Sequence, residues 1–219
     1  MCCKGVIGVK NKDWFNILLE EGYKNLPVTI PTHGPSHPQR MWDIYKENFS
    51  AKYNKIVDLD ILGAAIALHD MGVFYTRESK HGELSAKKAI SILKRKKFPE
   101  EKIPKVLEAI RWHDKPEDKI NRKTIESQLL YDLDVIDAFE ENGLRYFEIL
   151  VYRQKDAFEI PDYAIKNAEK RIRFLHTPEA KNICKNKLQP LIRYFEELRH
   201  NRAKLHRLYG EFKSQMNTQ

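Results

Sequence analysis

The sequence predicts an all-α fold, a single-domain helical bundle with long C-terminal helices. The 219-residue chain has only nine glycines, and its apolar residues recur at helical spacing with few alternating β-branched runs. Helix-start signals agree, and the clearest is Thr177-Pro178-Glu179, with threonine as the N-cap and proline at the first helical position. With 42% hydrophobic residues, the chain can bury one good-sized core.

The composition narrows the classes of partner. The chain has 39 basic and 31 acidic residues, a formal charge of +8, and the basic excess lies mainly beyond residue 140. This balance is compatible with nucleic acid, anionic lipid or a phosphorylated small molecule. No apolar run is long enough to span a bilayer, the N-terminus lacks a signal-peptide layout, and three cysteines do not make a disulfide framework. We therefore expect a cytoplasmic protein without a membrane partner.

Two helices are expected before the most apolar part of the chain. The first covers about residues 13–21 and the second about residues 38–53. Between them lies a loop with four prolines that carries His33 and His37. Because proline suits the first turn of a helix, Pro38 places His37 at or just inside the start of the second helix.

An almost entirely apolar run at residues 56–68 predicts a buried central helix. His69 and Asp70 follow directly, and Gly72 is placed to cap the helix. A buried imidazole and carboxylate cost free energy unless something pairs with them, and both are good ligands for a divalent metal. Taken alone, the pair is better explained as a helix cap bonded to backbone. The case for a metal therefore depends on other residues.

A second histidine–aspartate pair ends a later helix. A polar segment containing His81 leads into a helix at about residues 84–96, whose lysines form a solvated face. The next helix, at residues 101–113, ends with His113 and Asp114. This pair can hydrogen-bond to the metal ligands and so orient them, lie at the surface with its hydrogen bonds satisfied, or bind a second metal. We rank the supporting role first and the second metal last.

The helix expected at about residues 123–141 carries three aspartates within a core stripe. Leucines and other large apolar residues recur there at helical spacing, and Asp132, Asp134 and Asp137 interrupt them. Asp134 and Asp137 fall along one face. A semi-buried Asp134 needs a partner, and a bound cation would supply one.

Beyond residue 144 the chain is expected to stay helical. One helix covers residues 162–175, and a long one runs from residue 178 to Phe212, broken or bent near Pro190. The long helix approximates a heptad seam, which either packs on this domain or forms a homodimer contact. Both interpretations stay open. The apolar seam residues are Leu191, Phe195, Leu198, Leu205, Tyr209 and Phe212, with Arg202 at a seam position.

Four of these residues form the ordered pattern His37, His69-Asp70 and Asp134, with spacings of 32 and 64 residues. The chain in this respect resembles the HD-domain metal-dependent phosphohydrolases, in particular small bacterial members that act on nucleotides. The likeness covers about residues 33–198. Besides the four residues, it rests on His37-Pro38-Gln39-Arg40, on residues 68–72, 81–86 and 131–138, and on the C-terminal helices.

The resemblance implies that His37, His69, Asp70 and Asp134 bind one divalent metal, with Asp137 a weaker contender for the last position. It does not choose among manganese, cobalt, magnesium, nickel, iron and zinc. In the implied reaction, a metal-activated water attacks phosphorus.

Further roles follow from closeness to these ligands in the sequence. We take Asp70, His81 and His113 as candidate catalytic residues, the histidines acting as proton shuttle or as support for the metal. The candidates for phosphate binding are Arg40, Arg77 and Lys80.

The sequence departs from the family pattern at two places. Val135 follows Asp134 where the family carries an arginine, which removes a basic residue near the substrate. Val73 and Phe74 stand where some nucleotidase relatives carry a glutamate, which leaves open the group that orients the nucleophile.

We expect three regions: residues 1–32 as a lead-in with a short helix, residues 33–150 as the HD-type metal-site core, and residues 151–219 as a helical extension packed on it. The predicted function is hydrolysis of a phosphoester or phosphoanhydride bond in a nucleotide or similar small metabolite. One alternative is a non-catalytic sensor of metal or nucleotide. The other is an RNA-binding or RNA-processing protein, which is disfavoured because the aromatic residues recur at core spacing rather than as a stacking platform.

Overall fold

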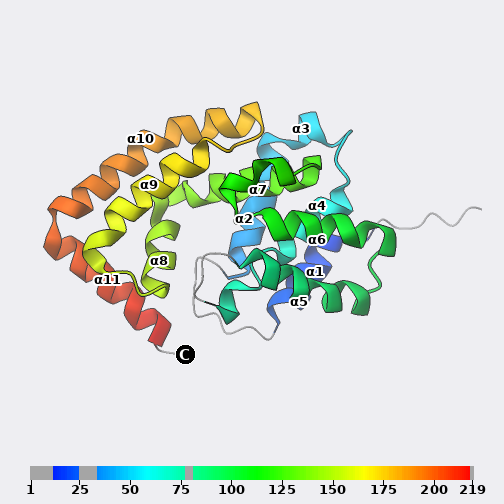
Figure 1. Cartoon of the computed structure of the whole chain (residues 1–219), viewed down its shortest axis with the longest axis horizontal. Helices are drawn as coiled ribbons and strands as arrows, with labels where there is room; N and C mark the ends of the chain where they lie inside the picture. The colour runs from blue at the N-terminus through cyan, green and yellow to red at the C-terminus, as the bar shows by residue number, and fades with distance from the viewer. Residues whose placement is uncertain (1–11, 25–33, 77–80, 218–219) are drawn as a thin grey trace, which may run out of the picture.

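Helices form every regular element that the structure describes (Figure 1). The computed structural model describes residues 12–24, 34–76 and 81–217, and within these ranges there are α-helices and short 3₁₀ helices but no strand. The helices up to residue 138 lie together at one end of the molecule, and those from residue 144 onward form the other end (Figure 1). The predicted all-α class is confirmed.

The helix α4 (Leu59–Leu68) lies at the centre of the first part. Its residues 61–68 are all buried. The carboxylate of Asp58 caps it by accepting two backbone N–H groups of its first turn. Because neighbouring helices enclose α4, the residues that follow its last turn are held deep in the core. Those neighbours are α1 (Trp14–Tyr23), α6 (Ile103–Trp112) and α7 (Ile125–Ala138).

The helix expected at residues 38–53 is divided in two, α2 (Ser36–Asn48) and α3 (Ser50–Tyr53). Phe49 separates them with φ −121° and ψ −29°, and its fully buried side chain anchors the bend in the core. The start of α2 lies two residues before the expected one. His37 is therefore in the first turn of α2.

Gly72 does not cap α4 through a left-handed conformation, as the sequence suggested. Its φ of −69° and ψ of −26° are ordinary right-handed values. The glycine is needed for space, since a Cβ atom there would lie 2.6 Å from the backbone oxygen of His81. This close approach brings α5 (Gly82–Arg95) against the end of α4. The connecting 3₁₀ helices are η2 (Val73–Tyr75), η3 (Glu100–Lys102) and η4 (Pro116–Asn121).

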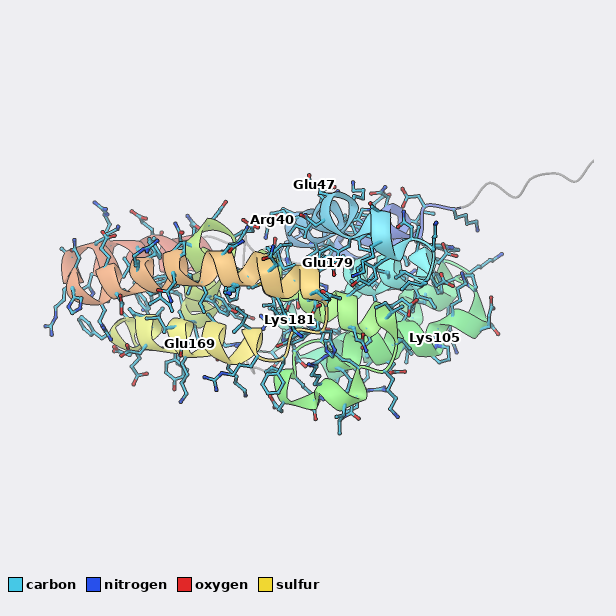
Figure 2. All side chains as sticks on the ribbon, turned by 90° about the horizontal axis from the view of Figure 1, so that it is seen from above. Arg40, Glu47, Lys105, Glu169, Glu179 and Lys181 are labelled. Carbon is cyan, nitrogen blue, oxygen red and sulfur yellow. The ribbon has the colours of Figure 1, made fainter. Side chains whose placement is uncertain are left out.

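The C-terminal part places two long helices side by side, with charged side chains along their outer faces (Figure 2). These are α9 (Ile160–Ile172) and α10 (Pro178–His200). The other elements of this part are η5 (Glu140–Gly143), α8 (Leu144–Tyr152), η6 (Ala157–Glu159) and α11 (Arg202–Asn217).

The long C-terminal helix breaks at Asn201 rather than at Pro190. Pro190 lies inside α10, where a proline removes one backbone hydrogen bond, and the helix nevertheless continues past it. At Asn201 the backbone leaves the helical region, with φ −110° and ψ 81°. Its side chain accepts the backbone N–H of Lys204 at 3.0 Å and so caps α11.

The apolar seam of α10 and α11 is largely buried within this chain. Leu191, Phe195 and Leu198 are fully buried, and Leu205 and Phe212 join them in the same core cluster. That cluster extends from Trp14 in α1 to the last helix. Within the described ranges, no helix is both long and apolar enough to cross a membrane.

Candidate metal centre

Four buried side chains meet where the beginning of α2 and the end of α4 face α7. His37 lies in the first turn of α2, His69 and Asp70 follow the last residue of α4, and Asp134 comes from the interior of α7. None of the four is more than 4% exposed. The fold thus brings together all four residues that the sequence pattern selected.

The atoms that these side chains present to one another have the spacing of metal ligands. His37 Nε2 lies 3.0 Å from His69 Nε2, and each lies 3.4 Å from Asp70 Oδ2. Asp134 Oδ1 is 3.4 Å from His37 Nε2 and 3.9 Å from His69 Nε2. Ligands about 2.0–2.2 Å from a divalent ion stand roughly 3.0–3.5 Å apart in octahedral or tetrahedral geometry. His37, His69 and Asp70 therefore form a group that could hold a metal ion, and Asp134 Oδ1 lies within 3.9 Å of both imidazoles of that group.

Hydrogen bonds behind the two imidazoles orient them toward this centre. His37 Nδ1 bonds to Asp137 Oδ2 at 2.8 Å, and His69 Nδ1 bonds to the backbone oxygen of Ile66 at 2.9 Å. Because both acceptors require the proton on Nδ1, they turn the Nε2 atom of each imidazole into the cluster. This is the orientation that metal ligation needs.

The charges in the cluster are strongly coupled. Burial and Arg145 lower the pKa of His37, but Asp137 and Asp134 outweigh them and raise it to about 9. Burial raises the pKa of Asp134, whereas Arg145 and Arg171 outweigh burial and hold that pKa well below its ordinary value. Asp134 is therefore ionised at neutral pH and available as a ligand.

A second group of imidazoles faces the other oxygen of Asp70. Asp70 Oδ1 lies 2.7 Å from His81 Nε2 and 3.3 Å from His113 Nε2, and these two nitrogens are 3.1 Å apart. His113 Nδ1 bonds to the backbone oxygen of Ile110 at 2.6 Å, the same arrangement that His69 has at the end of α4. Asp70 is thus shared by two groups of buried potential ligands.

A tight contact between α5 and α6 places His81 beside His113. The backbone N–H of Gly82 donates to Asp114 Oδ2 at 2.9 Å. A Cβ atom on Gly82 would lie 2.8 Å from the backbone oxygens of Ile110 and Arg111, so only glycine fits without a shift. The second histidine–aspartate pair is therefore part of the site, with its aspartate bonding to the first residue of α5.

The three aspartates of α7 have different partners. Asp134 faces the cluster, whereas Asp137 bonds to His37 Nδ1 and to Arg40 and so holds the His37 imidazole from behind. Asp132 points to the start of α10, where it accepts the backbone N–H and the hydroxyl of Thr177 at 2.7 and 2.6 Å. Asp134 thus presents an oxygen to the Nε2 atoms of both imidazoles, whereas Asp137 bonds to His37 Nδ1.

Of the three basic residues expected to bind phosphate, the structure describes only Arg40. Arg40 pairs with Asp137 through two hydrogen bonds of 2.7 and 2.9 Å and does not line the cavity beside the cluster. Its side chain is 41% exposed. Arg77 and Lys80 lie outside the described residues.

A cavity of about 300 Å³ opens beside the cluster. One wall is formed by His81 and three carboxylates, those of Asp70, Asp114 and Asp134. The C-terminal helices add cationic side chains to the lining, and none of these was among the residues selected from the sequence. The only sequence signal for them was the basic excess beyond residue 140. They are Arg145 on α8, Arg153 directly after α8, and Lys170 and Arg171 on α9.

Two of these arginines contact the proposed ligands directly. Arg145 donates to Asp134 Oδ1 at 2.8 Å and to Asp70 Oδ2 at 3.2 Å, and Arg171 forms an ion pair with the other oxygen of Asp134. Guanidinium groups therefore lie next to the ligand carboxylates although Val135 occupies the family's arginine position. They come from the helices that follow α7.

The fold and the site define a helical protein with buried histidines and aspartates that could hold a metal next to a cation-lined cavity. The family model of the HD domain matches residues 36–139, which thus form an HD domain followed by C-terminal helices. No curated protein and no solved structure matches the chain significantly. HD domains are typically those of metal-dependent phosphohydrolases, and the matched range holds both histidine groups but ends before Arg145.

Proposed function

We propose that the chain is a metal-dependent phosphohydrolase of the cytoplasm, with a nucleotide or a similar small phosphorylated metabolite as its substrate. Residues 33–150 would form the metal-site core, and residues 151–219 the extension that supplies substrate contacts. One observation carries the proposal: the Nε2 atoms of His37 and His69 lie 3.0 Å apart with an oxygen of Asp70 and one of Asp134 within 3.9 Å of each, and guanidinium groups line the cavity beside them. Metal ligands next to phosphate-binding cations are the two requirements of phosphoryl hydrolysis.

In this proposal His37, His69, Asp70 and Asp134 hold one divalent cation. Such an ion, when bound, polarises a phosphoryl oxygen and lowers the pKa of a water molecule. Arg145 and Arg171 neutralise the phosphoryl oxygens, because they already lie beside the ligand carboxylates. The enclosing helices keep bulk water from the cluster.

His81 and His113 have two alternative roles. With their Nε2 atoms against Asp70 Oδ1, they can carry a proton between the cavity and the site. Together with Asp70 they also form a second group of three potential ligands, so a second ion is the alternative. A His113→Ala variant separates these roles, because it lowers the metal content from two equivalents to one only if a second ion binds.

The proposal is tested by metal analysis and phosphate release. We expect the purified protein, after incubation with manganese, cobalt, magnesium, nickel, iron or zinc, to hold at least one equivalent of metal and to release phosphate or pyrophosphate from a member of a nucleotide panel. A His69→Ala variant should lose both properties. A His200→Ala variant, altered at an exposed histidine of α10, should keep them. Metal retention by His69→Ala would contradict the site.

The same panel separates the alternatives. A non-catalytic sensor would bind metal and nucleotide and raise its melting temperature without forming product. An RNA-binding protein would bind more tightly as the RNA lengthens and lose affinity steeply with salt. The burial of Phe147, Phe195 and Phe212 supports the small-molecule proposal over RNA, because these rings pack in the core.

A further inference from the structure

The cavity continues beyond the proposed metal ligands to a second set of cationic side chains. At the near end, Arg145 and Arg171 are paired with Asp134. Arg153, which follows α8, and Lys170, which precedes Arg171 on α9, line the same cavity. Neither of these two side chains is paired with Asp70 or Asp134, whereas Arg145 and Arg171 are.

Arg153 differs from the other buried arginines of this site. Its side chain makes no hydrogen bond or ion pair to the described residues, and its Nε atom is buried without a partner. Burial lowers the pKa of the Arg153 guanidinium. The charges of Asp70 and Asp114 raise it from a distance but do not outweigh burial. A guanidinium group in a partly desolvated place costs free energy unless an acceptor pairs with it. Since no described carboxylate does so, this guanidinium is available to an anionic ligand in the cavity.

Lys170 and Asn167 add to this position. They lie three residues apart on α9, on the same side of that helix, and both line the cavity. Lys170 forms an ion pair with Glu117 of η4 at 3.2 Å, and the two side chains are 50% and 45% exposed. A pair this exposed is weak and leaves the lysine available to a stronger anion.

The charges around the ligands indicate how many phosphates the cavity accommodates. Three carboxylates, those of Asp70, Asp134 and Asp137, face three guanidinium groups, those of Arg40, Arg145 and Arg171. The charges of these six side chains cancel. One bound divalent cation would therefore leave the ligand cluster with two excess positive charges, which one phosphoryl dianion balances. Arg153 and Lys170 lie outside this balance, and the ion pair of Lys170 with Glu117 is an exposed one that a separate anionic group can displace.

We propose that Arg153, with Lys170 and Asn167, forms a subsite for a phosphate that is not the one attacked. This inference rests on the proposed function and narrows its substrate to compounds with at least two linked phosphates, such as nucleoside di- or triphosphates. Water supplies a hydroxyl group to the phosphorus at the ligand cluster, and the bond from that phosphorus to the bridging oxygen breaks. The bridging oxygen takes the second proton and leaves with the phosphate held at Arg153.

Calorimetric titration with inorganic pyrophosphate and with orthophosphate tests the subsite without turnover of a nucleotide. We expect Arg153→Met to weaken pyrophosphate binding about tenfold or more, the effect of one charge-assisted hydrogen-bonding group, and to weaken orthophosphate binding less than about threefold. Arg153→Lys should lie between the wild type and Arg153→Met. Arg193→Met, altered at an exposed position of α10, is the matched control and should equal the wild type. Melting curves without ligand verify that each variant is folded.

Several outcomes separate this proposal from the proposed function. Equal loss of both anions in Arg153→Met, or no loss of either, would overturn the subsite. So would hydrolysis of phosphomonoesters alone at rates that Arg153→Met leaves unchanged, although the phosphohydrolase function would stand. Selective pyrophosphate binding without any product would support the subsite and contradict the function. Comparing inorganic triphosphate with a nucleoside triphosphate tells whether the nucleoside adds affinity.

Discussion

The two ends of the molecule contribute different chemistry to one cavity. The HD domain, residues 36–139, supplies imidazoles and carboxylates that are oriented by hydrogen bonds behind them, as His37 is by Asp137. The C-terminal helices supply cationic groups, of which Arg145 and Arg171 contact the same carboxylates. Ligands that share one ion must hold a common geometry, whereas cations that neutralise a phosphate can come from many positions. The common geometry of metal ligands therefore leaves an ordered pattern in the sequence. The positions of cations that neutralise a phosphate leave no such pattern.

Substitution of Asp70 should have the largest effect, because its two oxygens face both histidine groups. We expect Asp70→Ala to lose its bound metal and to lower phosphate release by about a thousandfold or more. Elemental analysis and a phosphate-release assay measure these quantities. Asp162→Ala, at an exposed position of α9, is the control. Undiminished turnover by an Asp70→Ala protein stripped of metal would refute the proposed mechanism.

Substitution of Arg145 tests the cationic side chains that the C-terminal helices contribute to the cavity. Arg145→Met leaves Asp134 and Asp70 with one buried cationic partner fewer, so the protein without added metal should lose roughly 3–5 kcal/mol of unfolding free energy. Added metal should raise the melting temperature of this variant more than that of the wild type, because the ion replaces the lost positive charge.

Phosphate release by metal-loaded Arg145→Met should fall while its metal content stays the same. Asp70→Ala differs from this variant because it is expected to lose the metal as well as phosphate release. Arg193→Met again provides a control at an exposed arginine. Loss of metal from Arg145→Met would assign this arginine to the ligand cluster rather than to the substrate.

A smaller effect, on stability, is expected at Gly82, whose close contact with the backbone of α6 positions the second histidine group. The methyl group of Gly82→Ala would meet two backbone oxygens at 2.8 Å, so α5 must shift and the variant should lose about 1–3 kcal/mol of stability. Gly210→Ala on α11 meets nothing within 4 Å and should instead stabilise the protein by about 0.5–1 kcal/mol. Urea unfolding compares the two. Equal stability of the two variants would contradict the tight contact between α5 and α6.

The smallest expected effect concerns pH and a histidine outside the cavity. Burial and the nearby Arg122 lower the pKa of His176 to about 4, and Arg122 Nε donates to His176 Nε2 at 2.9 Å. Because the unfolded chain takes up this proton near its ordinary pKa of about 6.5, the stability that His176 contributes is present above that pH and is lost as pH falls toward 4. His176→Gln should therefore show a smaller fall in melting temperature between pH 7 and pH 4.5.

The control for this measurement is His200→Gln, whose imidazole is exposed. Its melting temperature should follow the wild type across the same pH range. An identical pH dependence of His176→Gln and the wild type would show that His176 does not resist protonation in the folded state.

Helix boundaries illustrate how far local signals reach. The start of α10 at Thr177 follows from its cap sequence, and the structure has the expected hydrogen bond from the N–H of Ala180 to the threonine hydroxyl. The break before α11 was expected at Pro190 and occurs at Asn201. A proline weakens a helix locally, but packing of α10 on α9 keeps the helix intact, and such packing has no local sequence signal.

The sequence by itself determined the helical class, the central buried helix and the order of His37, His69, Asp70 and Asp134. It could do so because helical periodicity and ligand spacing are properties of the order of residues along the chain. Only the tertiary structure decided that His81 and His113 share Asp70 and that Arg145, Arg153 and Arg171 line the cavity in place of Arg40. The physical reason is that these positions depend on how α5, α8 and α9 pack against the core. That packing is set by distant contacts, such as the glycine contact of α5 with α6, rather than by neighbouring residues.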